Sequence, residues 1–368
     1  MNAWVGRVGP LFIILIALAG LGLLTLTSVA GGEWAPYAQS HMYKALLAFL
    51  VFFICAALPA ELWQQTGYLL HFFAILLLLV VEVIGETTKG AARWLDLGFF
   101  RLQPSEMVKI TILLALAQLF SRLPQGEMMS KQVVALILAI VLIPMVLILK
   151  QPDLGTALLV LFAALVALFV AGVDWRLFAA GGVLVVLSLP IGWMFLQPYQ
   201  RSRVLTFLDP ERDPLGAGYH ILQSQTAIGS GEFWGRGWLG GTQSQLNFLP
   251  EKHTDFILSV FAEEFGLFGV LLVFFLIFLL IAYCFLMAHL SRQVFTQIMC
   301  VGMGSVMFSY IFVNAGMVSG LLPVVGVPIP FMSFGGTAML TISVGFGCMI
   351  SCHVGEVWAE PRGGNFQS

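Results

Sequence analysis

The stretch that decides the fold is Gly266-Leu-Phe-Gly-Val-Leu-Leu-Val-Phe-Phe-Leu-Ile-Phe-Leu-Leu-Ile-Ala-Tyr-Cys-Phe-Leu-Met287, which contains no charged residue. About 20 consecutive apolar residues are enough for a helix to cross the hydrocarbon core of a bilayer. An uninterrupted apolar run of this length is atypical of soluble domains. The stretch therefore predicts a transmembrane helix.

Nine further apolar runs have the same character, so the sequence predicts an all-α integral membrane protein with ten transmembrane helices. These runs are 11–30, 45–59, 67–84, 105–120, 133–149, 155–172, 177–196, 295–318 and 335–352. Arg7 and the Ser28-Val29-Ala30 sequence flank the first run as they would in a signal peptide. Its apolar core is longer than that of a signal peptide, so we expect the helix to be retained.

The composition agrees with a membrane protein. Of the 368 residues, 59% are hydrophobic and only 10% are charged, whereas about a quarter of the residues in a soluble domain are charged. With 17 Lys and Arg against 19 Asp and Glu, the net charge is −2, which leaves no basic surface for nucleic acid. We expect a single polytopic membrane domain over residues 1–368.

Two long connections interrupt the apolar pattern, and both emerge on the same side of the membrane. The longer is 197–254, between the seventh and eighth runs, and the other is 86–104. Long charged loops in such an apolar protein are the first place to look for function. Their basic residues would suit an anionic ligand such as a lipid pyrophosphate. The positive-inside rule alone leaves the orientation of the helices undecided.

The strongest candidate site is Phe248-Leu-Pro-Glu-Lys-His-Thr-Asp-Phe256, directly before the eighth run. Pro250 suits the first turn of a helix, which would place Glu251, His253 and Asp255 around its opening turns. Glu263 follows Asp255 by just over two helical turns, so we expect the two carboxylates to share a face. The alternative is a solvated helix end without function.

Two further groups of polar residues lie beside apolar runs on that side. Glu106 and Lys109 are neighbours on one helix face, and ionisable residues at such depth usually face a bundle interior or a wet cavity. Asp153 follows a proline and precedes Gly155, which is typical of a helix cap. For both groups a purely structural role is the alternative.

The region after Asn314 is rich in proline and glycine, with Pro323, Gly326, Pro328 and Pro330. Broken helices at membrane depth are tolerated where they border protein or a polar cavity. This region is therefore a candidate wall of a groove.

Seven stretches carry a family resemblance, in order between Lys89 and Gly347. They are Arg93-Trp-Leu-Asp-Leu-Gly98, Gln103-Pro-Ser-Glu106, Gln151-Pro-Asp-Leu-Gly-Thr156, Asp209-Pro-Glu-Arg-Asp-Pro-Leu-Gly-Ala-Gly-Tyr219, Gly241-Thr-Gln-Ser-Gln245, Phe248-Leu-Pro-Glu-Lys-His-Thr-Asp-Phe-Ile257 and Pro323-Val-Val-Gly-Val-Pro328. Together they resemble the SEDS family (shape, elongation, division and sporulation). The form of Gly241–Gln245 is similar to its elongation branch rather than its division branch. Lys252 stands where relatives often have Arg or Ala.

The resemblance implies ten helices in the bacterial inner membrane, with cytoplasmic termini and the long loop on the periplasmic face. It implies a peptidoglycan glycosyltransferase that polymerises lipid II into β-1,4 glycan strands during cell-wall elongation and rod-shape maintenance. Asp255 corresponds to the catalytic carboxylate of the family. We expect the substrate-binding residues of the cavity to be Arg93, Arg101, Glu106, Lys109, Asp153, Arg201, Arg203, His253, Thr254 and Glu263.

For such a reaction the donor already carries a good leaving group, undecaprenyl pyrophosphate. The enzyme must supply a base for the acceptor GlcNAc 4-hydroxyl and positive charge near the pyrophosphate. Asp255 would be that base in a single, inverting displacement. A divalent cation, Mg²⁺ or Mn²⁺, on Asp255 or Asp153 would fit this chemistry, although no metal-ligand spacing demonstrates it; no organic cofactor is expected.

The resemblance also implies partners: lipid II and the nascent glycan strand, and a class B penicillin-binding protein within the elongation complex. The competing function is a transporter that flips lipid II across the membrane. It would need charges at the bilayer midplane, whereas the charges of this sequence gather on one side. A scaffold without catalysis would leave those charges without a role.

Overall fold

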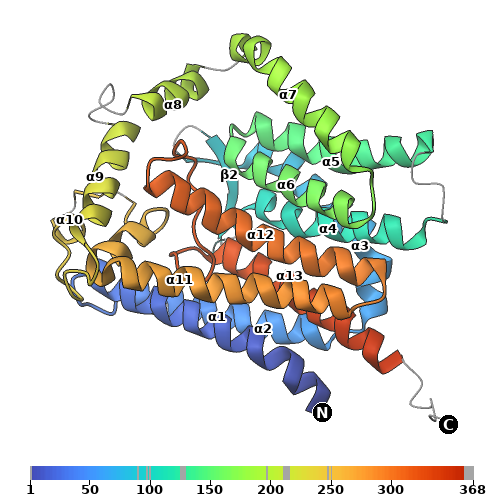
Figure 1. The fold of residues 1–368 in the computed structure, drawn as a ribbon, viewed down its shortest axis with the longest axis horizontal. Coiled ribbons are helices and arrows are strands. Elements are labelled where there is room, and N and C mark those ends of the chain that lie inside the picture. The colour runs from blue at the N-terminus through green and yellow to red at the C-terminus, as the bar shows by residue number, and fades with distance from the viewer. Residues whose placement is uncertain are drawn as a thin grey trace.

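The computed structural model is a helical bundle in which α1 begins and α13 ends at the same end (Figure 1). It describes residues 2–88, 91–96, 98, 101–124, 130–195, 198–209, 216–246, 248–249 and 251–359. Its helices are α1 (Asn2–Val29), α2 (Tyr37–Ala57), α3 (Ala60–Ile84), α4 (Pro104–Arg122), α5 (Lys131–Lys150), α6 (Leu154–Val170), α7 (Trp175–Phe195), α8 (Pro198–Leu208), α9 (Ala217–Ser230), α10 (Thr242–Gln245), α11 (Ile257–Leu290), α12 (Val294–Val318) and α13 (Gly336–Ala359).

Each of the ten apolar runs coincides with a helix, and over the described residues eight helices are long and apolar enough to cross a membrane. Two further apolar helices, Leu154–Val170 and the Trp175–Ser188 part of α7, are shorter. The prediction of a multi-pass, helical membrane protein is therefore confirmed.

The core of the bundle is formed by α4, α12 and α13. The most apolar 18-residue window of α4 is 89% buried, whereas the corresponding window of α11 is only 28% buried. α4 packs against α3, α6 and α12, while α13 packs against α2. Because α4 is enclosed by other helices, polar side chains on it face protein rather than lipid.

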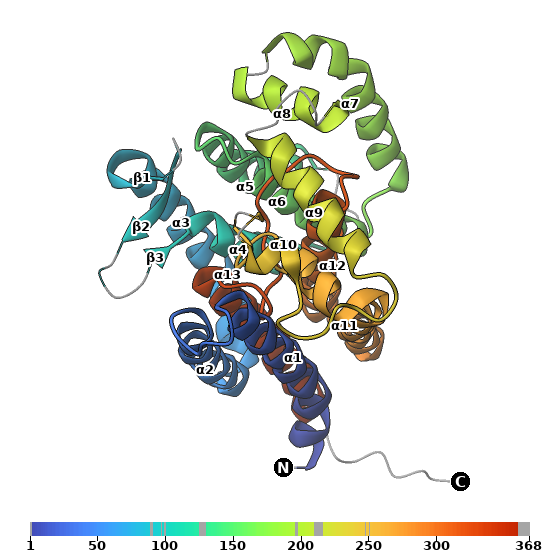
Figure 2. The same ribbon diagram turned by 90° about the vertical axis from the view of Figure 1, so that its left-hand side faces the viewer.

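The two long connections contain strands and helices that the sequence did not predict. Residues 86–104 include a three-stranded antiparallel sheet of β1 (Glu86–Thr88), β2 (Ala91–Asp96) and β3 (Arg101–Leu102), in which Leu95 pairs with Leu102. The long connection contains α8, α9 and α10, which lie at the end of the bundle away from the two termini (Figures 1 and 2).

α7 differs from the other long helices. Its described side chains are largely exposed, for example Leu184 and Leu187, each 68% exposed. Figure 1 shows α7 running along the outside of the bundle toward α8. An apolar helix with so little protein around it is suited to lipid on most sides.

Candidate functional site

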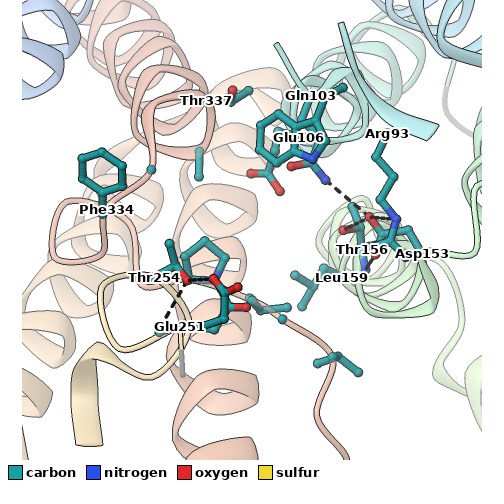
Figure 3. Close-up of a pocket in the computed structure, with 18 of the residues that line it drawn as sticks. Arg93, Gln103, Glu106, Asp153, Thr156, Leu159, Glu251, Thr254, Phe334 and Thr337 are labelled. Carbon is teal, nitrogen blue, oxygen red and sulfur yellow. Dashed lines mark hydrogen bonds and ion pairs between the residues drawn. The ribbon is translucent and has the colours of Figure 1, made fainter. Parts of the chain in front are cut away.

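A cavity of about 400 Å³ opens at the end of the bundle where α4 and α6 begin (Figure 3). This volume is within the range of small-molecule sites. One side, here called the helix wall, is formed by Arg93, Gln103, Glu106, Asp153 and Thr156. The other side, the loop wall, is formed by Glu251, Thr254, Asp255 and the segment 324–328.

On the helix wall, Glu106 belongs to a buried triad. Pro104 stands in the first turn of α4, which places Glu106 at the positive end of the helix dipole. Lys109 Nζ donates to Glu106 Oε1 and to Tyr310 Oη, at 2.6 Å each, and the Tyr310 hydroxyl donates to Glu106 Oε2. Lys109 is 1% exposed. Of the pair, Glu106 reaches the cavity and Lys109 lies behind it.

Asp153 both caps α6 and lines the cavity. Its carboxylate accepts hydrogen bonds from Thr156 N at 3.2 Å, Thr156 Oγ1 at 2.9 Å and Gln103 Nε2 at 3.4 Å. Arg93 Nε lies 4.0 Å from Asp153 Oδ2 and donates to the carbonyl of Gln151 at 3.1 Å. The guanidinium of Arg93 therefore ties β2 to the turn that precedes α6, and it brings positive charge to the cavity.

On the loop wall, Asp255 lies in a turn rather than in a helix. Residues 251–256 form consecutive turns, and α11 begins at Ile257, later than Pro250 predicts. Glu251 has a φ of 52°, a left-handed conformation that a helix cannot contain. Its carbonyl accepts from Thr254 N at 3.1 Å, and its carboxylate accepts from Thr254 Oγ1 at 3.1 Å.

The proline- and glycine-rich segment between α12 and α13 forms the rest of the loop wall, as the sequence predicts. Gly326 has a φ of 75°, and a Cβ at this position would lie 3.1 Å from Asp255 Oδ2. The backbone of this segment therefore lies close to the carboxylate, and a side chain at position 326 would crowd it.

Glu263 does not line the cavity. It is fully buried, and its carboxylate accepts from Gln243 N at 2.9 Å, Thr242 Oγ1 at 3.2 Å and Ser244 N at 3.3 Å. Lys252 Nζ donates to the carbonyl of Ser244 at 2.6 Å. Because the turns at 251–256 replace the expected helix, Glu263 holds the loop that contains α10 and shares no helix face with Asp255.

His253 also acts away from the cavity lining. Its ring stacks on Tyr37 with the centroids 4.7 Å apart, and its carbonyl accepts from Phe334 N at 2.9 Å. Phe334 lines the cavity and contacts both rings. His253 thereby links α2, the turn before α11 and the α12–α13 connection.

The other predicted arginines whose side chains the structure describes lie away from the cavity lining. Arg101 lies 3.5 Å from Asp96 with its side chain 62% exposed. Arg201, on α8, donates to the carbonyl of Met194 at 2.8 Å. The side chain of Arg203 lies outside the part of the chain that the structure describes. Of the five predicted cations, only Arg93 is among the described residues that line the cavity.

Several lining residues were not predicted as site residues. Gln103, Thr156 and Glu251 stand inside the family motifs that contain Glu106, Asp153 and Asp255, and this proximity in the sequence was the available signal. His220, half-buried on α9, contacts the ring of Phe256 at 6.0 Å between centroids. No spacing in the sequence connects His220 to the turn that holds Asp255.

A divalent cation would find only part of its ligands here. Among the described residues, no group of three or more His, Cys, Asp or Glu side chains is arranged to hold a metal. Mg²⁺ is commonly bound by one or two carboxylates together with the phosphates of a substrate. The cavity carboxylates fit that mode of binding and do not form a complete protein site.

Comparison with known proteins shows the family to which the chain belongs. The cell cycle protein family of FtsW, RodA and SpoVE matches residues 10–356. The chain belongs to this family. It is 44% identical over 344 residues to the peptidoglycan glycosyltransferase MrdB of Escherichia coli K12, covering 93% of this chain and 92% of MrdB. A probable peptidoglycan glycosyltransferase FtsW of Escherichia coli O6:H1 is 33% identical, covering 89% and 81%.

Two solved structures share the fold. A chain from a peptidoglycan synthase complex, described as coordinating polymerization and crosslinking, has a TM-score of 0.81 and 32% identity, covering 94% of this chain and 96% of that one. The rod shape determining protein RodA of Thermus thermophilus has a TM-score of 0.70 and 27% identity, covering 94% and 96%. The predicted SEDS membership is confirmed.

Proposed function

We propose that the cavity is where this peptidoglycan glycosyltransferase joins lipid II to a glycan strand, with Asp255 as the base. The observation that carries the proposal is that Asp255 and Arg93 line the same cavity. Figure 3 shows Arg93 on the side opposite Glu251 and Thr254, the residues of the turn that contains Asp255. A carboxylate and a guanidinium that line one cavity meet both needs of the reaction, a proton acceptor and positive charge.

In the proposed step, Asp255 takes the proton of the acceptor GlcNAc 4-hydroxyl as its oxygen attacks the anomeric carbon of the donor. The new C–O bond forms while the bond to the pyrophosphate breaks, and the electron pair leaves with undecaprenyl pyrophosphate. Attack from the face opposite the leaving group inverts the α-linked donor to a β-1,4 product. The proton then passes from Asp255 to solvent.

The other wall would hold the charged part of the donor. Arg93 is fixed by the carbonyl of Gln151, so its charge is pre-organised and little reorganisation accompanies the reaction. A divalent cation carried by the pyrophosphate and held by Asp255 or Asp153 would supply further positive charge at the leaving group.

We also propose that all ten apolar helices cross the inner membrane, with both termini cytoplasmic and the cavity periplasmic. The lipid tail would remain in the bilayer. A class B penicillin-binding protein of the elongation complex is the proposed partner, supported by the likeness to a subunit of a synthase complex that coordinates polymerization and crosslinking.

The test is polymerisation of purified lipid II by the protein co-purified with the class B partner. Asp255→Asn keeps the shape of the side chain and removes the base, so we expect a loss of about 10²- to 10⁴-fold in rate. The matched control is Asp174→Asn, an exposed carboxylate next to α7 that accepts from Arg176 N and should leave the rate unchanged. EDTA, followed by Mg²⁺ or Mn²⁺, tests the cation in the same assay.

Equal rates for the wild type and a folded Asp255→Asn variant would remove Asp255 as the base. Wild-type protein that moved lipid II across proteoliposomes without joining it would favour the transporter.

A further inference from the structure

Asn314 lies behind the loop wall, fully buried in the last turns of α12. Its Nδ2 donates to the carbonyl of Asp255 at 2.8 Å and to the carbonyl of Val327 at 2.7 Å. These two acceptors belong to the two separate segments that make the loop wall. One amide group therefore joins the turn that contains Asp255 to the α12–α13 connection. These two hydrogen bonds are here called the join.

Both carbonyls need such a donor. The turn at 251–256 and the segment 324–328 lie outside helices and strands, so no regular pattern of backbone bonds supplies donors to their carbonyls. Carbonyl groups shielded from water are costly when no donor reaches them. An asparagine side chain offers two N–H donors on one atom. The reverse orientation would place Oδ1 against two carbonyl oxygens, so the surroundings fix the direction of the amide.

The join also affects the position of the Asp255 carboxylate. Val327 follows Gly326, whose backbone lies against the carboxylate of Asp255. The two hydrogen bonds of Asn314 therefore hold both the end of the turn that contains Asp255 and the backbone that lies opposite its carboxylate. Asn314 is not among the described residues that line the cavity.

We propose that Asn314 is a positioning residue that aims the Asp255 carboxylate, without touching substrate itself. This inference rests on the proposed role of Asp255. Misplacement of a catalytic group by about 1 Å can cost on the order of 10²-fold in rate. Loss of these two hydrogen bonds should thus lower kcat and leave the binding of lipid II nearly unchanged, because Asn314 is not among the described residues that line the cavity.

The experiment compares Asn314→Asp and Asn314→Leu, which lack both donors, with Asn314→Gln, which keeps the amide on a longer side chain. The matched control is Gln118→Leu. Gln118 is a buried amide on α4 that donates to the carbonyl of Gln65 and accepts from Tyr68 N, away from the cavity. We expect kcat to fall about 10- to 100-fold in Asn314→Asp and Asn314→Leu, and by a smaller factor in Asn314→Gln. In Gln118→Leu, the kcat of the folded protein should equal that of the wild type.

A second readout does not depend on catalysis. Hydrogen exchange should accelerate in peptides covering 251–256 and 323–328 in Asn314→Leu, and in neither of these peptides in Gln118→Leu. Unchanged exchange and kcat would overturn the proposal, as would a rise in KM at constant kcat. The two proposals can fail separately. If Asp255→Asn stayed active while Asn314→Leu showed faster exchange in both peptides, the structural role of Asn314 would be supported and Asp255 would not be the base.

Discussion

The two walls of the cavity are built in different ways. On the helix wall, each carboxylate has a cationic partner: Glu106 pairs with Lys109, and Asp153 lies near Arg93. Asp153 also accepts a hydrogen bond from the Thr156 hydroxyl. These charged groups project from the first turns of α4 and α6 or from the adjoining sheet. On the loop wall, Asp255 lies in irregular backbone that is held from behind by a few side chains. Charge is thus fixed by helix starts on one side, and geometry is fixed by tertiary hydrogen bonds on the other.

The largest effect should follow from breaking the pairing of the helix wall. Lys109→Met leaves Glu106 buried without its cation, and the loss of one partner of a buried ion pair costs about 3–5 kcal/mol. We expect a sharply lower unfolding temperature in detergent and loss of polymerisation. Thermal unfolding and the lipid II assay measure the two effects.

The double variant Glu106→Gln/Lys109→Met separates structure from chemistry. Removing both charges should restore most of the stability, because the Tyr310 hydroxyl can still donate at position 106. Activity should stay low, since Glu106 lines the cavity. Full recovery of activity would mean that the triad only supports the fold. A single Lys109→Met variant as stable as wild type would show that the pair is not coupled.

A smaller effect should follow from a change on the loop wall at Gly326. In Gly326→Ala, the new methyl group meets Asp255 Oδ2 at 3.1 Å in a backbone conformation with a φ of 75°. The left-handed conformation alone costs about 1–2 kcal/mol, and displacement of Asp255 should lower the rate about tenfold. Gly172→Ala is the control, with a φ of 92° and no atom within 4 Å of the new carbon. If Gly172→Ala lowered the rate and the stability as much as Gly326→Ala does, backbone strain alone would explain the effect.

The difference between the walls also explains what the sequence could predict. Glu106 and Lys109 lie three residues apart, and Asp153 caps the helix that begins beside it, so local spacing was enough to propose both groups. The loop wall depends on contacts between distant residues, such as Asn314 with Asp255. No local sequence pattern indicates such contacts. The predictions that a helix begins at Pro250 and that Glu263 shares a helix face with Asp255 were therefore wrong.

In the fold as well, local sequence predicts the membrane helices but not the structure of the connections. Apolar runs specify membrane helices because each must satisfy its own backbone in lipid, and all ten runs coincide with helices. The sheet at 86–102 and α8 and α9 lie in the connections, where polar sequence permits several local structures. Among the predicted cations, Arg93 reaches the cavity because β2 pairs with its neighbours, a pairing that composition does not reveal.

The smallest effect on the rate should come from Glu263, which binds the loop that contains α10 and does not itself line the cavity. Its carboxylate accepts from two backbone N–H groups and the Thr242 hydroxyl. Glu263→Gln replaces one acceptor oxygen by a donor that faces an N–H, so we expect a loss of about 1–3 kcal/mol in stability. The rate per folded molecule should change only a few-fold, because Asp255 keeps its bond to Asn314. Thermal unfolding and the lipid II assay again measure both.

The neighbouring Glu264 provides the control for that prediction. It is equally buried and accepts from the Ser28 hydroxyl, but its Oε2 has no hydrogen-bond partner in the described part of the chain. Glu264→Gln should therefore cost less stability than Glu263→Gln. If the order were reversed, the loop that contains α10 would not depend on Glu263. If Glu263→Gln instead abolished polymerisation in a stable protein, that loop would govern the position of Asp255 as strongly as Asn314 does, and the loop wall would have two equivalent anchors.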